Sequence, residues 1–303
     1  MAGRVRYECL VTERRNPRSR DLDRLPPRRI AALMNREDAR AVRAVGRQGR
    51  AIARAVELIV RALRARGRLV FVGAGTSGRL GVLEAAECPP TFGTPPSLVQ
   101  AVMAGGRGAV FRSREGAEDD ARAARRAVGA RVRRGDVVVG VSASAVTPFV
   151  GAALATAQRR GARTVLVTCN PSRSRRVAAD VRITLGAGPE VVAGSTRLKA
   201  GTATKLVLNT LTTAAMAQLG RLYGNRMVDV QPRSRKLRER AARLVAELGG
   251  TSLPRARRTL ARAGGRVRIA VVMERRNLSA GAAARALRAA GGSLRSAIES
   301  PGR

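Results

Sequence analysis

Residues 68–93 read RLVFVGAGTSGRLGVLEAAECPPTFG, and this stretch predicts the core of the fold. The apolar run 69–72 is long enough for a buried strand, and residues 79–87 predict a helix. Pro89 and Pro90 are expected to end that helix, because proline lacks the N–H group that a helix needs. A strand, a glycine-rich turn and a helix in this order can form an anion site, because free N–H groups and the helix dipole converge there.

The turn itself, Gly73-Ala74-Gly75-Thr76-Ser77-Gly78, admits three interpretations. It can be an ordinary strand-to-helix corner in which glycine relieves steric crowding. Its spacing also fits the G-x-G-x-x-G fingerprint of dinucleotide binding, which needs an acidic residue about 20 positions on to hold the ribose. The next predicted strand, 98–103, ends in Ala104-Gly105-Gly106, so that acid is missing and a nicotinamide-dependent dehydrogenase is disfavoured. The third interpretation is a phosphate pocket, which the hydroxyl groups of Thr76 and Ser77 suit.

Composition limits the functions that the chain can have. Its 303 residues can bury one large core and one small core, and 45% hydrophobic residues are typical of a globular protein. Lys+Arg 59 against Asp+Glu 21 give a net charge of +38, which by itself would suggest a polyanion as partner. The basic residues are spread along the whole chain and aromatic residues are only 2%, so a specific nucleic-acid partner is not expected.

The cysteine and histidine content excludes several kinds of site. Cys9, Cys88 and Cys169 are too few and too scattered for a disulfide framework, and a chain without histidine has neither His-ligated zinc nor a Ser-His-Asp triad. The cysteines are likewise too few and too scattered for a metal site, so no metal is expected, and no cofactor is expected either. The N-terminus lacks the apolar core of a signal peptide. The uncharged stretch 137–158 contains glycine, proline and hydroxyl residues, so it predicts a strand, a loop and a helix rather than one membrane-spanning helix, and no membrane is expected as a partner.

Apolar runs alternate with helical segments through the first two-thirds of the chain. Such alternation is typical of an α/β fold with a parallel sheet that is covered by helices on both faces. The predicted strands are 69–72, 98–103, 137–141, 164–168 and 181–185, and the further predicted helices are 35–66, starting at Asn35, then 117–133, 148–160, 174–179 and 201–223. Short helices at 238–248, 253–263 and 280–290 predict a small helical C-terminal domain. The expected division is an N-terminal arm, 1–34, an α/β domain, 35–232, and the helical domain, 233–303.

Several words of the sequence resemble one known family. GAGTSGRLGVLEAAECPPTFG at 73–93 is followed by EGAED at 115–119, TCNP at 168–171, GPEVV at 188–192, GSTRLKAGTA at 194–203 and NRMVDV at 225–230. In this order they are similar to the N-acetylmuramic acid 6-phosphate etherases, members of the SIS (sugar isomerase) superfamily. The resemblance runs from about Val11 to the last helix, and it implies an SIS-type parallel sheet.

The resemblance implies a lyase of amino-sugar metabolism that acts in cell-wall sugar recycling. The D-lactyl ether of N-acetylmuramic acid 6-phosphate would be broken, giving D-lactate and N-acetylglucosamine 6-phosphate. By family position, Glu87 donates a proton to the leaving lactate and Glu118 is the second acid/base. Such a pair is expected where burial raises a carboxyl pKa towards neutrality. From the residues alone, Glu118 could instead balance a helix dipole in a first turn, and Glu84 is expected to face solvent.

Hydroxyl-rich turns after two strands form the expected phosphate site, because ligands bind at the carboxyl ends of strands in open α/β sheets. Ser142 and Ser144 could otherwise merely cap the helix that follows. The family words add Glu190, Ser195 and Lys199, with Lys199 either meeting the lactyl carboxylate or lying on the surface. The predicted substrate-binding residues are Gly75, Thr76, Ser77, Ser142, Ser144, Thr147, Glu190, Ser195 and Lys199.

One loop departs from the family pattern. The family usually has Ser-Gly-Arg-Thr-Pro where this chain has SAVTP at 144–148. A glycine that can take a positive φ is replaced by Ala145, and an arginine is replaced by Val146. The alternative function is therefore a non-catalytic regulator that binds a sugar phosphate on the same SIS fold. With either function, a cytoplasmic homodimer with a small-molecule sugar phosphate as its ligand is expected.

Overall fold

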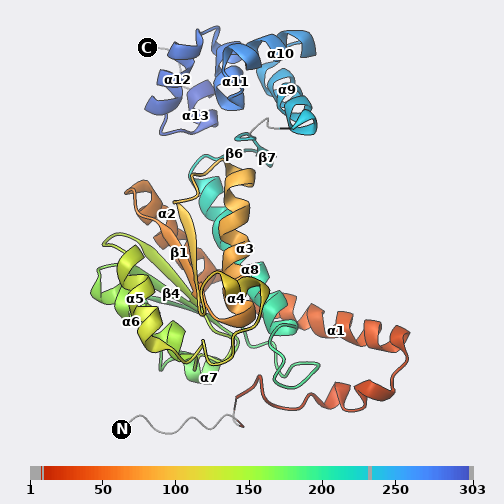
Figure 1. Ribbon diagram of the computed structural model, residues 1–303. Helices are drawn as coiled ribbons and strands as arrows, with labels where there is room; N and C mark the ends of the chain where they lie inside the picture. Colours follow the sequence, from red (N-terminus) through yellow and green to blue (C-terminus); the bar gives the residue numbers. More distant parts are fainter. Residues whose placement is uncertain (1–7, 9, 231–233, 300–303) are drawn as a thin grey trace. The chain divides into compact units, whose positions relative to one another are not determined.

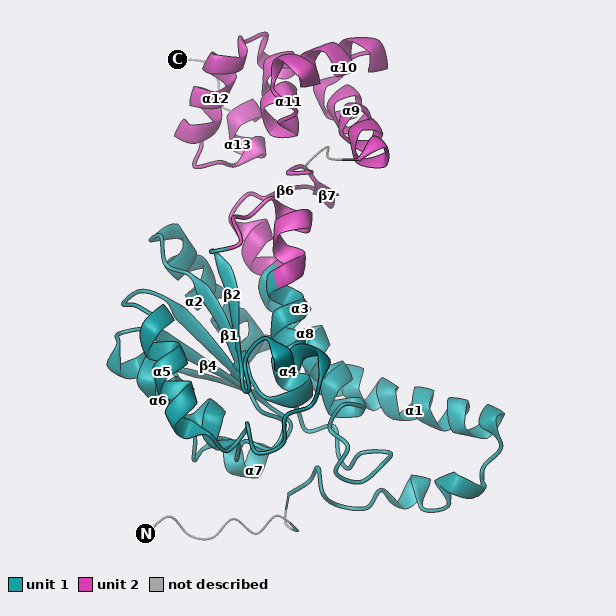
Figure 2. Ribbon diagram, in the orientation of Figure 1, with its two compact units in different colours: residues 1–85, 97–212 teal, residues 86–96, 213–303 magenta. Residues whose placement is uncertain are grey.

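The structure is a computed structural model that describes residue 8 and residues 10–230 and 234–299. Part of the predicted N-terminal arm, Cys9 and the predicted boundary after residue 232 lie outside the described residues. The chain forms two compact units, residues 1–85 with 97–212 and residues 86–96 with 213–303 (Figure 2). This division differs from the predicted one, because the second unit includes the C-terminal ends of two long helices as well as the helical tail.

The first unit is built on a five-stranded parallel sheet. Its strands are β1 (Leu69–Gly73), β2 (Val99–Met103), β3 (Val137–Val141), β4 (Arg163–Thr168) and β5 (Val181–Thr184). They are ordered β2-β1-β3-β4-β5, and Leu69 pairs with Val99 on one side and with Val137 on the other. β1 and β3 are buried along their whole length, which explains why their sequences are continuous apolar runs rather than alternating ones.

Helices cover both faces of this sheet. The helices that lie wholly or partly in the first unit are α1 (Pro27–Gly46), α2 (Gly49–Arg64), α3 (Gly75–Phe92), α4 (Gly108–Phe111), α5 (Ala121–Arg131), α6 (Pro148–Arg159), α7 (Pro171–Ser174) and α8 (Lys199–Gln218). α5 and α6 pack on the face that carries Val70 and Val72, and α2 and α3 lie on the other (Figure 1). There a Cβ at Gly81 of α3 would lie 2.8 Å from Cβ of Phe71. The predicted α/β fold is confirmed.

The first long helix differs from its prediction. α1 begins at Pro27, whose fixed φ suits a first helical position, so Asn35 lies inside this helix and does not start one. The chain leaves the helix at Arg47 and Gln48, and α2 follows as a separate helix. The predicted single helix 35–66 is therefore wrong, because two separate helices cover it and the first begins at Pro27.

Four other helices also differ from their predicted bounds. α3 continues through Pro89 and Pro90 to Phe92, and burial of Phe92 holds the turn that proline weakens. α5 begins only at Ala121, because the Asp120 carboxylate accepts a hydrogen bond from Ala123 N and caps the helix there. The predicted helix 174–179 is replaced by the short α7, and α8 ends at Gln218.

The second unit has its own helical core. It contains the hairpin strands β6 (Leu222–Tyr223) and β7 (Arg226–Met227) and the helices α9 (Arg235–Gly249), α10 (Leu253–Arg262), α11 (Val267–Arg276), α12 (Ala280–Ala289) and α13 (Leu294–Glu299). α11 supplies the largest share of the buried side chains, as its apolar sequence requires. Asp229 pairs with Arg268 at 2.5 Å and with Arg221 at 3.2 Å, which ties the segment after β7 to α11.

Candidate functional site

A pocket of about 260 Å³ opens at the carboxyl ends of β1 and β3. The loops after these two strands, residues 74–77 and 141–148, form two of its walls. β1 and β3 are neighbours in the sheet, but the chain leads from β1 first to β2 on the other side. This reversal of strand order leaves a crevice above the sheet, which is where open α/β folds bind ligands.

Three glycines shape the turn after β1, for two different reasons. Gly75 adopts φ +53°, which L-residues rarely take. A Cβ at Gly73 would lie 2.7 Å from Gly78 N, and one at Gly78 would lie 2.7 Å from Gly73 O, so the turn closes backbone on backbone. The close approach aims the N-terminus of α3 at the pocket, where Gly75, Thr76 and Ser77 are all lining residues.

The loop after β3 is held by its own hydroxyl groups. Ser142 Oγ lies 2.8 Å from Thr147 Oγ1 and accepts a hydrogen bond from Ala145 N at 3.1 Å. Ser144 Oγ accepts from Val146 N at 3.3 Å. The N-cap residue of α6 is Thr147, so the simple capping role considered for Ser142 and Ser144 is wrong. The structure brings both serines and Thr147 to the pocket.

Ala145 adopts φ +58°, in the left-handed region that favours glycine. The loop therefore keeps the backbone path that glycine would give it, although alanine stands there. Val146 lines the pocket with an apolar side chain at the position where the resembling family usually has arginine.

Glu118 lines the pocket from a turn that precedes α5. Its backbone oxygen accepts a hydrogen bond from Phe149 N at 2.9 Å, which fixes the turn against the start of α6. Because α5 begins three residues later, Glu118 is not an acid of a first helical turn, and the dipole interpretation is wrong. Its side chain is exposed, so the burial expected for it is not provided by this chain alone.

Glu84 and Glu87 of α3 have the opposite exposure to the one expected from sequence. Glu84 is 4% exposed, and its carboxylate accepts hydrogen bonds from Lys205 Nζ and, at 2.7 Å, from Thr212 Oγ1. Glu87 is exposed, and it lies in the part of α3 that belongs to the second unit. Glu87 is not among the described residues that line the pocket, so its role as the catalytic partner of Glu118 stays a prediction.

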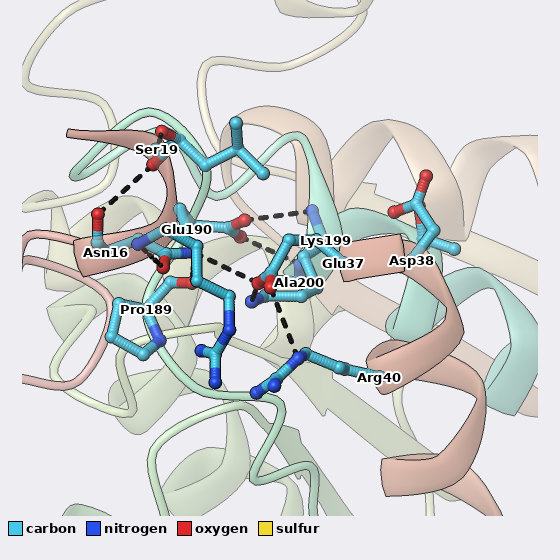
Figure 3. Close-up of polar contacts among 12 residues, drawn as sticks. Asn16, Ser19, Glu37, Asp38, Arg40, Pro189, Glu190, Lys199 and Ala200 are labelled. Atoms are coloured by element: carbon cyan, nitrogen blue, oxygen red, sulfur yellow. Dashed lines mark hydrogen bonds and ion pairs between the residues drawn. The ribbon is translucent and has the colours of Figure 1, made fainter. Parts of the chain in front are cut away.

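Glu190 and Lys199 are buried in a network beside α1 and do not line the pocket (Figure 3). The Glu190 carboxylate accepts hydrogen bonds from Lys199 N at 2.9 Å and Ala200 N at 2.8 Å, and so caps α8. Lys199 is 2% exposed, and its ammonium group pairs with Glu37. Lys199 is therefore not a surface lysine, and its contact with the lactyl carboxylate stays a prediction.

The pKa values in this network follow from burial and charge. Burial raises the pKa of Glu190 above its ordinary value, although the two N–H donors and the Lys199 charge oppose this. Burial alone would raise the pKa of Glu37 as well, but the hydrogen bond and the charge of Lys199 lower it overall. Ser195, the remaining predicted residue, is half-buried and donates its N–H to Val192 O at 3.0 Å.

Curated relatives match this chain over almost its whole length. The N-acetylmuramic acid 6-phosphate etherase of Picosynechococcus sp. is 47% identical over 292 residues, which are 96% of this chain and 97% of the relative. The enzyme of the same name from Symbiobacterium thermophilum is 52% identical over 263 residues, 87% and 88% of the two chains. The chain belongs to the N-acetylmuramic acid 6-phosphate etherase family.

Two domain-family models and a solved structure agree with this membership at the level of the fold. The glucokinase regulatory protein N-terminal SIS domain matches residues 51–158, and the SIS domain matches residues 118–214. A phosphoheptose isomerase from Francisella tularensis superposes with a TM-score of 0.50 at 15% identity, over 63% of this chain and 97% of that one. The likeness to that isomerase shows a shared SIS fold and no more.

Sequence reasoning missed part of the pocket of this etherase-family chain. Leu10 and Glu13, from the segment interpreted as an irregular arm, form one wall, and Gly194 and Thr196 stand beside them. Gly194 and Thr196 lie in the motif 194–203, whose resemblance to the family drew attention to this segment but did not show which of its residues line the pocket. Asp119, next to Glu118, was also missed as a lining residue.

The charge of the pocket is opposite to that of the chain. Three carboxylates line it, those of Glu13, Glu118 and Asp119, and the described lining residues include no lysine and no arginine. Over the part of the chain that the structure describes, no group of three or more histidine, cysteine, aspartate or glutamate side chains could hold a metal ion. Within the same residues, no helix has both the length and the apolar character needed to cross a membrane.

Proposed function

We propose that this protein is a lyase that cleaves the D-lactyl ether of N-acetylmuramic acid 6-phosphate. The products are N-acetylglucosamine 6-phosphate and D-lactate, a step in the recycling of cell-wall sugars. The observation that carries the proposal is the identity of 47% and 52% to etherases over 96% and 87% of this chain. The regulator considered from sequence has no support among these relatives, which carry the etherase name.

The chemistry needs an acid and a base but no redox step. When the sugar ring opens, the aldehyde acidifies the proton at C2, and a carboxylate can remove it. The C3–O bond then breaks, the lactate oxygen takes a proton, and water adds to the unsaturated aldehyde. In this proposal Glu118, which lines the pocket, is the base, and Glu87 protonates the leaving lactate.

Neutral donors hold the phosphate in this proposal. Thr76, Ser77, Ser144 and Thr147, which carry hydroxyl groups, line one pocket together with the N-terminus of α3. Backbone N–H groups at a helix start bind anions without any cationic side chain. This suits a pocket whose charged lining residues are acids, because the phosphate is kept at the α3 side, among donors that cannot titrate.

We further propose that the active form is a cytoplasmic homodimer. The exposed carboxylate of Glu118 supports this, because an acid/base group is tuned by exclusion of water and one chain alone leaves it open. Sedimentation or light scattering of the purified protein checks the dimer, and cell fractionation checks the location. A monomer with full activity would contradict the first part of this proposal.

Release of D-lactate from N-acetylmuramic acid 6-phosphate tests the reaction. The wild type should release it, and Glu118→Gln and Glu87→Gln should each lower kcat by about 100-fold or more, which is the usual contribution of a general acid or base. Glu115→Gln is the matched control, because Glu115 lies in the turn of Glu118 and is exposed but does not line the pocket.

Each outcome of this experiment discriminates between explanations. Release that Glu118→Gln and Glu87→Gln leave unchanged contradicts their assigned roles but keeps the reaction. Binding of the substrate by the wild type without any release contradicts the etherase and favours the regulator. Loss of release in Glu115→Gln as well would indicate damage to the turn and not loss of a catalytic group.

A further inference from the structure

The segment that carries Glu13 is fixed in place as a wall of the pocket. Leu10 is 1% exposed, and Thr12 O accepts a hydrogen bond from Gly194 N at 2.9 Å. Ser19 Oγ donates to Val191 O at 2.7 Å. These contacts join the start of the chain to the loop that leads into α8, more than 170 residues away in sequence.

Asn16 ties the same segment to the buried ion pair. Its Nδ2 group donates to Glu37 Oε2 at 3.0 Å and to Pro189 O at 3.3 Å (Figure 3). Glu37 in turn pairs with Lys199 at the start of α8. The wall is therefore anchored on α1 and α8, two helices of 20 residues each, and the position of Glu13 is set by rigid elements.

The Glu13 carboxylate has acceptor capacity that the protein does not use. Thr12 Oγ1 donates to its Oε1 at 3.2 Å, and a Cβ at Gly194 would lie 3.0 Å from its Oε2. Over residues 10–230 and 234–299, no lysine or arginine pairs with it, although the chain has 59 such residues. A carboxylate can accept about four hydrogen bonds, and the Glu13 side chain is exposed and lines the pocket, so most of this capacity is available to a ligand there.

A carboxylate in this position selects what can lie next to it. It repels the phosphate and any other anion, and it attracts neutral hydroxyl and amide N–H donors. Gly194 leaves Oε2 uncovered, and its φ of +78° is a conformation that a side chain at this position would rarely tolerate. Resting on the function proposed above, we infer that Glu13 contacts the sugar itself, accepts hydrogen bonds from its hydroxyl or amide N–H groups, and determines specificity for a sugar phosphate over a bare anion.

Calorimetric binding of two probes tests this inference. The probes are N-acetylglucosamine 6-phosphate, which has both the sugar and the phosphate, and inorganic phosphate. Glu13→Ala should weaken binding of the sugar phosphate by about 10- to 100-fold, the effect of losing hydrogen bonds to a charged acceptor. Binding of inorganic phosphate should stay unchanged or become tighter, because a repelling charge is gone.

Two more variants make the result specific. Glu13→Gln keeps an acceptor without the charge, so its loss of sugar-phosphate affinity should be smaller than that of Glu13→Ala. Asp23→Asn is the charge-matched control, because Asp23 is an exposed acid of the same N-terminal region outside the pocket. It should bind both probes as the wild type does, and thermal unfolding should be the same for all variants.

The outcomes separate this inference from the proposed function. If the wild type binds the sugar phosphate and Glu13→Ala binds it equally well, the role of Glu13 is refuted and the pocket assignment stands. If Glu13→Ala weakens both probes equally, the segment only supports the pocket wall, and the inference is again refuted. If the wild type binds neither probe, the pocket assignment fails and the role of Glu13 fails with it.

Discussion

Replacing Ala145 with glycine should relieve strain in the pocket loop. Ala145 adopts φ +58° and is 7% exposed. A non-glycine residue in this left-handed conformation costs about 1–2 kcal/mol, because its Cβ approaches the carbonyl oxygen of the chain too closely. Ala145→Gly removes this cost while the Ser142 Oγ to Ala145 N hydrogen bond can remain.

Two terms oppose the relief. Removing a buried methyl group costs about 0.8 kcal/mol, and glycine stabilises the unfolded chain by about 0.4–1 kcal/mol through its extra freedom. These terms roughly cancel the relief, so the free energy of unfolding of Ala145→Gly should stay within about 1 kcal/mol of the wild type.

Ala162→Gly is the matched control. Ala162 is 5% exposed, lies in coil between α6 and β4, and is not among the residues with positive φ. It has both unfavourable terms and no strain to relieve, so this variant should lose about 1–2 kcal/mol. The difference between the two variants, about 1–2 kcal/mol, measures the backbone strain at Ala145.

Urea unfolding followed by far-UV circular dichroism gives these free energies, since the chain has no tryptophan for fluorescence. Equal m-values among the three proteins are required before the free energies are compared. Hydrogen exchange of peptides from the first unit, which contains both alanines, assigns the change to that unit. If Ala145→Gly loses as much stability as Ala162→Gly, the alanine at 145 is not strained and the reasoning is refuted.

Further predictions concern residues around the sheet. Lys199→Met and Glu37→Gln should each lower the free energy of unfolding by about 3–5 kcal/mol, because each leaves a buried group without its partner. In a double-mutant cycle, the variant with both substitutions should lose clearly less stability than the sum of the two single losses. Folding lowers the pKa of Glu37, so its ionised carboxylate stabilises the folded protein at pH values above the unfolded pKa of about 4.3. The difference in free energy of unfolding between the wild type and Glu37→Gln should therefore shrink as the pH falls below about 4.3. Burial raises the pKa of Cys169 to about 12, so peptide mapping should find it alkylated by iodoacetamide at pH 8 only in urea, and alkylation of the native protein would contradict this burial. Gly78→Ala should destabilise by about 1–3 kcal/mol, because its Cβ would lie 2.7 Å from a backbone oxygen, whereas Gly151→Ala in the open face of α6 should stabilise by about 1 kcal/mol in the same urea assay.

The sheet could be predicted from sequence because its signal is local. Each strand is a short apolar run between glycine or charged residues. A strand that is buried on both faces must be apolar along its whole length, so the ends of the apolar run mark the ends of the strand. The predicted strand 137–141 is the observed β3, and the predicted 69–72 misses only the last residue of β1. The turns after β1 and β3 could be located by the same reasoning, because they come directly after these strands, and their phosphate-binding role stays a prediction.

Helix ends were harder because distant contacts outweigh local signals. Pro89 and Pro90 weaken the hydrogen bonds of α3, yet Cys88 and Phe92 are 1% and 6% exposed and keep that turn in place. Glu84 was expected to face solvent from its position along the helix alone. Its burial depends on α8, where Lys205 and Thr212 lie more than 120 residues further along the chain.

The same limit applies to a motif that resembles a family and whose side chains turn out to have partners inside the protein. Lys199 and Glu190 lie in words that resemble a family of enzymes, and a contact with substrate was the simplest interpretation. In the structure both side chains are satisfied internally, one by Glu37 and the other by the N–H groups of α8. An ion pair that anchors the wall carrying Glu13 constrains the sequence as strongly as a ligand contact would, because breaking it would leave a buried charge unpaired. Resemblance to a family therefore cannot by itself separate residues that line the pocket from residues, such as Lys199, whose partners lie inside the protein.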